Sequence, residues 1–194
     1  NGFGANTDGV RIDVFGAVGD YLGSGNDGMI IHMHGNGQDQ IGQIHKSGEL
    51  IVHGDVGQCY GYGSKGGKLF VLGNAAGRPM INSVGSPKLV INGTALDYLA
   101  ESFMAGDPLD GGGFVIVNGM QFDERGELIS LETPYPGGNL FSLASGGAIY
   151  IRDPRQRLSD SQLNGGAFTD MTDADWDVVQ PILYRNQEHF GIPL

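Results

Sequence analysis

Short apolar runs recur along the chain at an almost constant interval. Each run holds four or five residues, alternates in the direction of its side chains, and is rich in β-branched and aromatic residues. Such runs are too short for helices and are typical of strands. Glycine follows the first five runs at once, at positions 16, 35, 54, 73 and 93, which are separated by 19, 19, 19 and 20 residues. The seven runs are residues 11–15, 30–34, 50–53, 69–72, 89–92, 114–118 and 148–151.

The direction of the repeat predicts how these strands pair. The whole unit repeats in one direction, so successive strands are equivalent and should stack in parallel, each contacting only its neighbours. One coil of about 20 residues per repeat describes a β-solenoid. About seven coils, stacked about 4.8 Å apart, make a rod roughly 30 Å long. We therefore predict an all-β fold, a parallel β-helix.

Glycines are spaced regularly between the predicted strands, in the pattern Gly-x-x-Gly-x-x-x-Gly. Glycine supplies 35 of the 194 residues, which is more than twice its ordinary usage of about 7%. Corners that turn the chain within a few residues need a positive φ or a close backbone approach, which glycine supplies without steric cost. The predicted turn glycines are Gly16, Gly19, Gly23, Gly35, Gly42, Gly54, Gly57, Gly61 and Gly73.

Alternation within each strand separates an inward face from an outward face. Inward positions carry aliphatic residues, as in Leu50 and Val52. The outward positions form two ladders, one from Phe15 through His34 and His53, the other from Asp13 through His32. A continuous apolar stripe follows on the outward face, and a soluble monomer seldom exposes such a patch. We expect a partner subunit, a second copy of the chain or the chain's own tail to cover it. The candidate interface is Ile51, Phe70, Leu72, Val90 and Ile116.

The C-terminal segment predicts one helix. Thr172 is placed as an N-cap, and acidic residues follow it in the first turn. Apolar residues from Val178 to Leu183 lie on one helical face, whereas Pro181 should kink or split the helix. The helix is expected either to cap the open end of the rod or to pack on the apolar stripe, since bare strand edges invite aggregation.

Three histidines, His32, His34 and His53, are stacked neighbours in the outward ladders. Imidazole groups suit zinc or iron, so a metal site built on them is geometrically possible. The sequence places no cysteine or carboxylate in register beside them. The alternative is a stacked aromatic ladder on a solvated or covered face, and we expect that arrangement, with no metal. No catalytic residue is assigned. Cys59 lacks an identifiable base, so we interpret it as a structural corner residue.

Composition narrows the classes of partner. The chain has 11 Lys and Arg residues against 22 Asp and Glu, a formal charge of −11, which disfavours nucleic-acid binding. No apolar run reaches the roughly 18 residues that a membrane helix needs, so no membrane partner is expected. The single cysteine excludes an intrachain disulfide and favours a reducing compartment. These features predict a cytoplasmic protein.

The repeated glycine pattern resembles the GXGXG domain. Residues 54–61 (GDVGQCYG) and 138–151 (GNLFSLASGGAIYI) carry the resemblance most clearly. That domain forms the C-terminal part of the glutamate synthase large subunit, and it also occurs as one of the subunits of formylmethanofuran dehydrogenase and in stand-alone form. The resemblance implies a right-handed parallel β-helix without an active site of its own. It divides the chain into residues 1–153, with a polar insertion at 121–137, and a linker with a capping helix at 154–194.

The resemblance also implies a role and a set of partners. It indicates a non-catalytic scaffold of a glutamine-dependent oxidoreductase, bound to an amidotransferase subunit and an FMN-binding synthase subunit. The chain itself would hold no cofactor, and FMN and an Fe–S cluster would lie in the partners. Three alternatives remain: a scaffold of the formylmethanofuran dehydrogenase type, an enzyme with a metal site on the histidine ladder, and a self-associating structural protein that forms a homo-oligomer.

Overall fold

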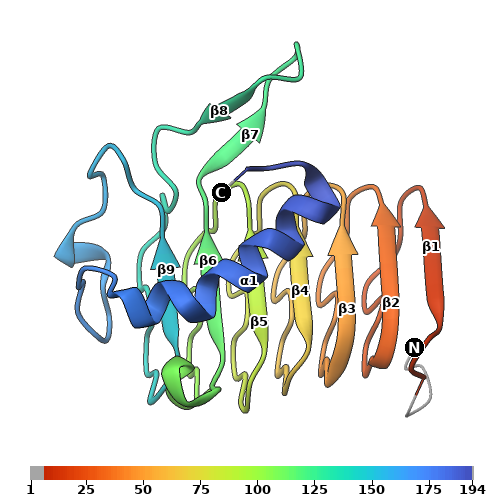
Figure 1. The fold of residues 1–194 in the computed structure, drawn as a ribbon, viewed down its shortest axis with the longest axis horizontal. Coiled ribbons are helices and arrows are strands. Elements are labelled where there is room, and N and C mark those ends of the chain that lie inside the picture. Colours follow the sequence, from red (N-terminus) through yellow and green to blue (C-terminus); the bar gives the residue numbers. More distant parts are fainter. Residues whose placement is uncertain (1–6, 194) are drawn as a thin grey trace.

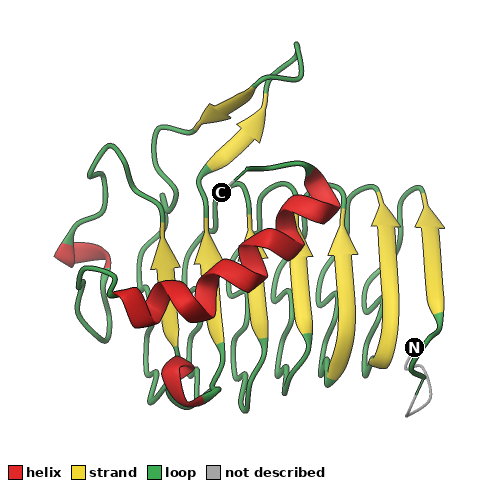
Figure 2. Cartoon of the chain, viewed as in Figure 1, coloured by secondary structure: helices red, strands yellow, loops and turns green. Residues whose placement is uncertain are grey.

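The chain forms one parallel sheet of seven strands with a helix across its outer face (Figures 1 and 2). This computed structural model describes residues 7–193, so the predicted start of the first region at residue 1 lies outside the described residues. The strand order in the sheet follows the chain, β1-β2-β3-β4-β5-β6-β9. The strands are β1 Arg11–Phe15, β2 Asp27–His34, β3 Ser47–Val52, β4 Lys68–Val71, β5 Lys88–Ile91, β6 Phe114–Val117 and β9 Ala148–Ile151.

The register of the sheet confirms the predicted stacking of the strands. Every neighbouring pair is parallel, and Phe70 lies between Ile51 and Val90, one repeat away on each side. The same register places Asp13 beside His32. Because side chains alternate across a strand, this register fixes two faces: inward residues such as Leu50, which is fully buried, and the outward ladders.

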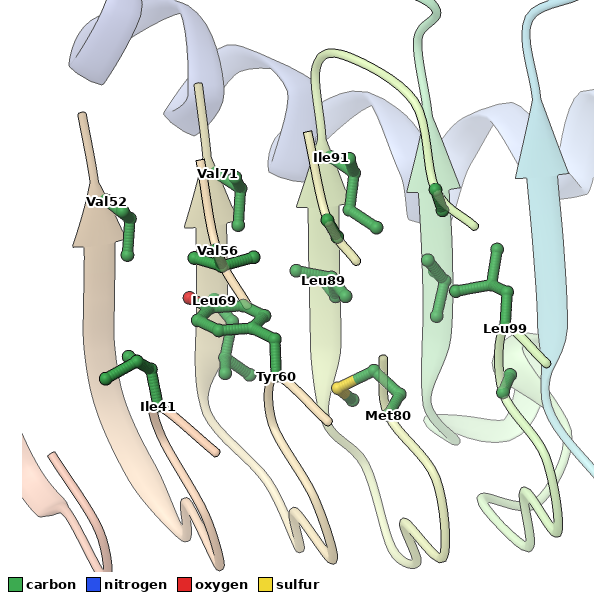
Figure 3. Close-up of a cluster of buried hydrophobic side chains, with 14 of the residues drawn as sticks. Ile41, Val52, Val56, Tyr60, Leu69, Val71, Met80, Leu89, Ile91 and Leu99 are labelled. Carbon is green, nitrogen blue, oxygen red and sulfur yellow. The ribbon is translucent and has the colours of Figure 1, made fainter. Parts of the chain in front are cut away.

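The core lies between the inward face of the sheet and the connections that return behind it. The four connections from β2 to β6 contribute large side chains that point toward the strands (Figure 3). These side chains recur at the repeat interval and are fully buried, because they fill the space opposite strand residues such as Leu69 and Leu89. They are Ile41, Tyr60, Met80 and Leu99. The repeat therefore buries a connection residue as regularly as it buries strand residues.

The predicted all-β parallel β-helix is wrong as a description of this fold. Regular strand pairing is confined to one sheet; the connections behind it contribute only isolated bridges, such as those from Val56 to Ala75 and from Ala75 to Ala95. The physical reason is the backbone of the connections. Residues such as Gln40 and Cys59 have φ of 54° and 57°, which interrupts an extended strand. The observed arrangement is a seven-stranded parallel sheet with irregular connections and one long helix.

The helix α1 spans Asp173–Phe190 and packs on the sheet instead of capping its end. The predicted N-cap is confirmed, because the side chain of Thr172 accepts a hydrogen bond from the backbone N–H of Asp175. The expected split at Pro181 is wrong, since α1 continues through it. Proline removes one intrahelical hydrogen bond, but Ile182 beside it is buried on the sheet, so packing holds both halves in one helix.

Residues 121–137 are more ordered than a polar insertion suggests. β7 Met120–Phe122 and β8 Leu128–Ser130 form an antiparallel hairpin that projects beyond the C-terminal end of β6 (Figure 1). Tyr135 then returns to the core, where it is fully buried and its hydroxyl donates to the carbonyl of Gly138 at 2.6 Å. Two short 3-10 helices, η1 Pro108–Asp110 and η2 Asp160–Gln162, complete the elements. A parallel bridge from Leu140 to Leu163 extends the stack beyond residue 153.

Eight of the nine turn glycines meet one or both of two requirements. At Gly61 the backbone is left-handed, with φ of 68°, and a Cβ would also lie 2.7 Å from the sulfur of Met80. At Gly54, φ is not positive, but a Cβ would lie 2.7 Å from the carbonyl oxygen of Gly35 in the preceding repeat. Gly19 shows neither feature. Close stacking of repeats therefore demands glycine as much as the turns do.

Candidate functional site

The apolar stripe on the outward face lies beneath α1. Ile51, Phe70 and Val90 are fully buried, and they pack in one cluster with Val179 and Ile182 of the helix. Ile116 is also buried, and Leu72 is half-buried. The stripe predicted as a partner interface is therefore covered by the chain's own tail, one of the three coverings that the sequence left open. A partner must bind elsewhere on the described surface.

A buried set of three asparagines joins the helix to the sheet. The side-chain amide of Asn92 donates to the carbonyl of Val71 at 2.8 Å and to Oδ1 of Asn186 at 2.9 Å. Its own Oδ1 accepts from the amide groups of Asn118 and Asn186, both at 2.8 Å. Asn92 is fully buried, so this network fixes where along the sheet the helix lies.

A charged contact holds the C-terminal half of the helix. The guanidinium of Arg185 donates from Nε and Nη2 to the carboxylate of Glu49 on β3, at 3.0 and 2.7 Å, and Nζ of Lys68 lies 3.3 Å from it. Burial alone would raise the pKa of Glu49, but its contacts with His189 and Arg185 outweigh burial and hold that pKa well below its usual range. The carboxylate is therefore ionised wherever the helix is in place.

The three predicted histidines lie close together on the outward face. His32 and His34 are on β2, and His53 is the residue after β3. Nδ1 of His32 lies 3.3 Å from Nε2 of His53, and one ring nitrogen from each of His32, His34 and His53 lies within 4.8 Å of the other two. The rings are stacked, with centroids 4.7 Å apart for His34 and His53, and Phe15 extends the stack at 4.4 Å from His34. His32 is buried, and the other two are half-buried.

Two further side chains belong to the cluster, and the sequence analysis missed both. Oδ1 of Asp13 lies 2.9 Å from Nε2 of His34, so the statement that no carboxylate is in register beside the histidines is wrong. Asp13 already stood in the ladder of His32, and its proximity could have been inferred from the alternation. His189 comes from α1, with its ring centroid 5.5 Å from that of His32. No sequence signal places it there, because its position depends on how the helix packs.

The environment of the cluster keeps the imidazoles of His32 and His53 neutral near pH 7. Burial lowers the pKa of His32 to about 4. Burial and the neighbouring rings of His34 and His189 lower the pKa of His53. A hydrogen bond from Arg11 and another from His34 hold the pKa of Asp13 well below its usual range, so this carboxylate accepts hydrogen bonds and carries a negative charge. The site therefore presents the neutral imidazoles of His32 and His53 beside one carboxylate.

His45, which is close in sequence, lies apart from this cluster. It is fully buried at a turn, where Nε2 is 3.4 Å from the carbonyl of Gly48, and Nδ1 has no hydrogen-bond partner among the described residues. Burial lowers its pKa to about 4, and the carboxylates of Asp27 and Glu49 only partly oppose that shift. His45 therefore stays neutral in the native state while the unfolded chain takes up a proton.

This difference in protonation between the native and unfolded states predicts that His45 lowers the stability of the protein at acid pH. Above pH 6.5 the side chain is neutral in both states, so it adds no pH dependence. As pH falls from 6.5 to about 4, only the unfolded state gains the proton, and the free energy of unfolding should fall by about 3 kcal/mol. Denaturant unfolding of wild type and His45→Gln at several pH values measures this. The variant should lose that part of the slope, and the two slopes should agree above pH 7. Equal slopes below pH 6.5 would contradict the prediction.

Other parts of the described chain offer no assembled catalytic group. Burial raises the pKa of the Cys59 thiol, and no histidine contacts it in the described structure. An apolar cavity of 390 Å³ lies between α1 and the outer faces of β6 and β9, lined by residues such as Trp176, Leu183 and Tyr150. Among residues 7–193, Arg152 is the one charged residue that lines it. None of the helices in the described residues is both long enough and apolar enough to cross a membrane.

A repeated strand-and-turn unit, stacked into one parallel sheet and covered on its outer face by a helix, defines a repeat protein. Residues 2–174 match the family model described as the GXGXG motif. The chain belongs to the GXGXG motif family, the domain family associated with glutamate synthase. Searches of curated proteins and of solved structures returned no significant match.

Proposed function

We propose that this chain is a non-catalytic structural component of a glutamate-synthase-like, glutamine-dependent oxidoreductase. In this role it holds an amidotransferase subunit and an FMN-binding synthase subunit in a fixed relative position, and FMN and the Fe–S cluster belong to those partners. The observation that carries the proposal is the match to the GXGXG family over residues 2–174. The proposal rests on this family association and not on a catalytic group in the chain.

The architecture suits a rigid spacer. From β3 to β6 the sheet is buried on both faces, by the connections on one side and by α1 on the other. Seven strands about 4.8 Å apart span roughly 29 Å. Within the described residues, both edges, β1 and β9, have strand neighbours on one side only. A body of this kind keeps two bound partners at a set distance.

We assign the β1 edge as a partner-binding surface. Its outer side pairs with no other strand in the described residues, so its backbone groups are free to pair with an added strand. Exposed apolar side chains lie at or near the same edge: Phe15 is 77% exposed, and Val10 and Tyr21 are also exposed. Such an edge usually needs protection from unspecific association, and a bound subunit would provide it.

Affinity capture with this chain as bait, followed by mass spectrometry and an absorption spectrum, tests the proposal. An amidotransferase and a yellow flavoprotein in a fixed ratio are expected. Phe15→Glu should release at least one of them, whereas Tyr184→Glu, at a side chain that is 51% exposed on α1 and lies away from both edges, should not. Recovery of a pterin-containing molybdenum or tungsten subunit would assign the chain to the formylmethanofuran dehydrogenase type instead. Glutamine turnover by the chain alone would refute a structural role.

A further inference from the structure

We propose that His32, His34 and His53 form a binding site for one zinc ion on the outward face of the sheet, next to the end of α1. His32 and His34 are two residues apart on β2, so both point outward. His53 follows β3 and is stacked beside His34. Three imidazoles thus lie on one face of the sheet, at the ends of neighbouring strands. This site is independent of the structural role proposed above.

One separation between ring nitrogens already matches what a zinc ion needs. Zinc–nitrogen bonds of 2.0–2.1 Å in a tetrahedron place two ligand nitrogens about 3.4 Å apart. Nδ1 of His32 and Nε2 of His53 are 3.3 Å apart. The full set lies within 4.8 Å, which is about 1.4 Å more than the tetrahedral edge. His34 and His53 are half-buried, with stacked rings, and zinc binding requires these two rings to rotate so that their nitrogens converge.

The carboxylate of Asp13 favours a cation beside the histidines, and the guanidinium of Arg11, bonded to the same carboxylate at 2.9 Å, opposes it. Asp13 accepts a hydrogen bond from His34 at 2.9 Å. A carboxylate bonded to a ligand imidazole is a common partner in zinc sites, because it orients the ring and raises its basicity. His32 is fixed from the other side by edge-on contact with the ring of His189. The chain as a whole carries a formal charge of −11, which attracts cations to its surface.

The donor set distinguishes zinc from other ions. Three imidazoles without a thiolate or a cage of oxygen ligands suit zinc, copper or nickel and disfavour magnesium and calcium. Copper and nickel usually take square-planar or tetragonal positions, whereas ligands from two adjacent strands converge from one side and leave the outward direction free. Three protein ligands with a fourth position open to water is the arrangement that zinc adopts at reactive sites.

Titration of the purified chain with zinc, after removal of any histidine tag, tests this site. We expect one zinc ion per chain, a rise in the melting temperature, and, with cobalt in place of zinc, the visible absorption of a tetrahedral cobalt ion. His34→Asn with His53→Asn should weaken binding at least 100-fold, and Asp13→Asn should weaken it 10- to 100-fold. His45→Gln, which changes a histidine outside the cluster, should bind zinc as wild type does.

A measurement on the wild-type protein tests the site even if the double variant does not fold. In wild-type protein, zinc should shift the imidazole NMR signals of His32, His34 and His53 and leave those of His45 unchanged. Absence of binding at micromolar zinc, or equal binding by a folded double variant, would overturn the proposal. Neither outcome bears on capture of the partner subunits, so the zinc site and the structural role can fail separately.

Discussion

Ile182→Asp should lower the free energy of unfolding by about 3–5 kcal/mol, because it places an unpaired carboxylate in a buried apolar cluster. Ile182 is 6% exposed and packs with the stripe of Ile51, Phe70 and Val90. The neighbours of Ile182 in that cluster are aliphatic and aromatic side chains. The variant has two ways to respond: it unfolds as a whole, or α1 separates from the sheet. Either response exposes the stripe, so binding of a hydrophobic dye should rise and proteases should cut near the C-terminal helix.

The neighbouring variant Tyr184→Asp provides the control. Tyr184 lies on the same helix two positions later, but it is 51% exposed, so the same charge should cost less than about 0.5 kcal/mol there. Denaturant unfolding of both variants, with dye binding measured in parallel, separates burial from helix propensity. If Ile182→Asp were as stable as Tyr184→Asp, the helix would not be held by this cluster.

Asn92→Leu should be costly for a different reason. Leucine is close in size to asparagine, but it removes the partner of two buried amides, those of Asn118 and Asn186. Each buried polar group that loses its partner costs about 1–3 kcal/mol, so the variant should lose about 4 kcal/mol in total. Chemical unfolding monitored by the fluorescence of Trp176, which lies on α1, measures the loss and reports whether the helix separates first.

Gln187→Leu is the matched control for that change. It replaces an exposed amide by leucine one position after Asn186 on the helix, where no buried partner among the described residues is left behind. Its stability should stay within about 0.5 kcal/mol of wild type. A loss for Asn92→Leu no larger than that of the control would mean that the asparagine network contributes little and that apolar packing alone positions the helix.

The strands and their inward and outward faces could be predicted because the same alternating pattern recurs in every repeat. Ile51, Phe70 and Val90 occupy equivalent positions, so a shift of one residue would turn all of them to the wrong face. The same logic placed His34 beside His53, as observed. The connections could not be predicted with equal success. Their buried residues recur at the same interval, but they form bridges and turns with positive φ instead of strands.

The position of the helix could not be read from the sequence. Its N-cap at Thr172 depends on local hydrogen bonds and was predictable. Its place on the sheet depends on contacts across long stretches of chain, such as that between Arg185 and Glu49, 136 residues apart. For the same reason His189 was absent from the predicted histidine set, although it completes one wall of the cluster. Contacts between the helix and the sheet join residues outside the repeat, so they leave no periodic pattern in the sequence.

The length of α1 determines how much of the sheet is left accessible. Its 18 residues span about 27 Å, which covers five to six strands at about 4.8 Å each. Gly191, with φ of 72°, ends the helix just where the histidine ladder begins. One more turn would add about 5.4 Å, close to the width of one strand, and would cover His34 and His53. The length of the helix therefore sets the solvent exposure of the outer face: a longer helix would cover more of that face, and a shorter helix would leave more of it exposed.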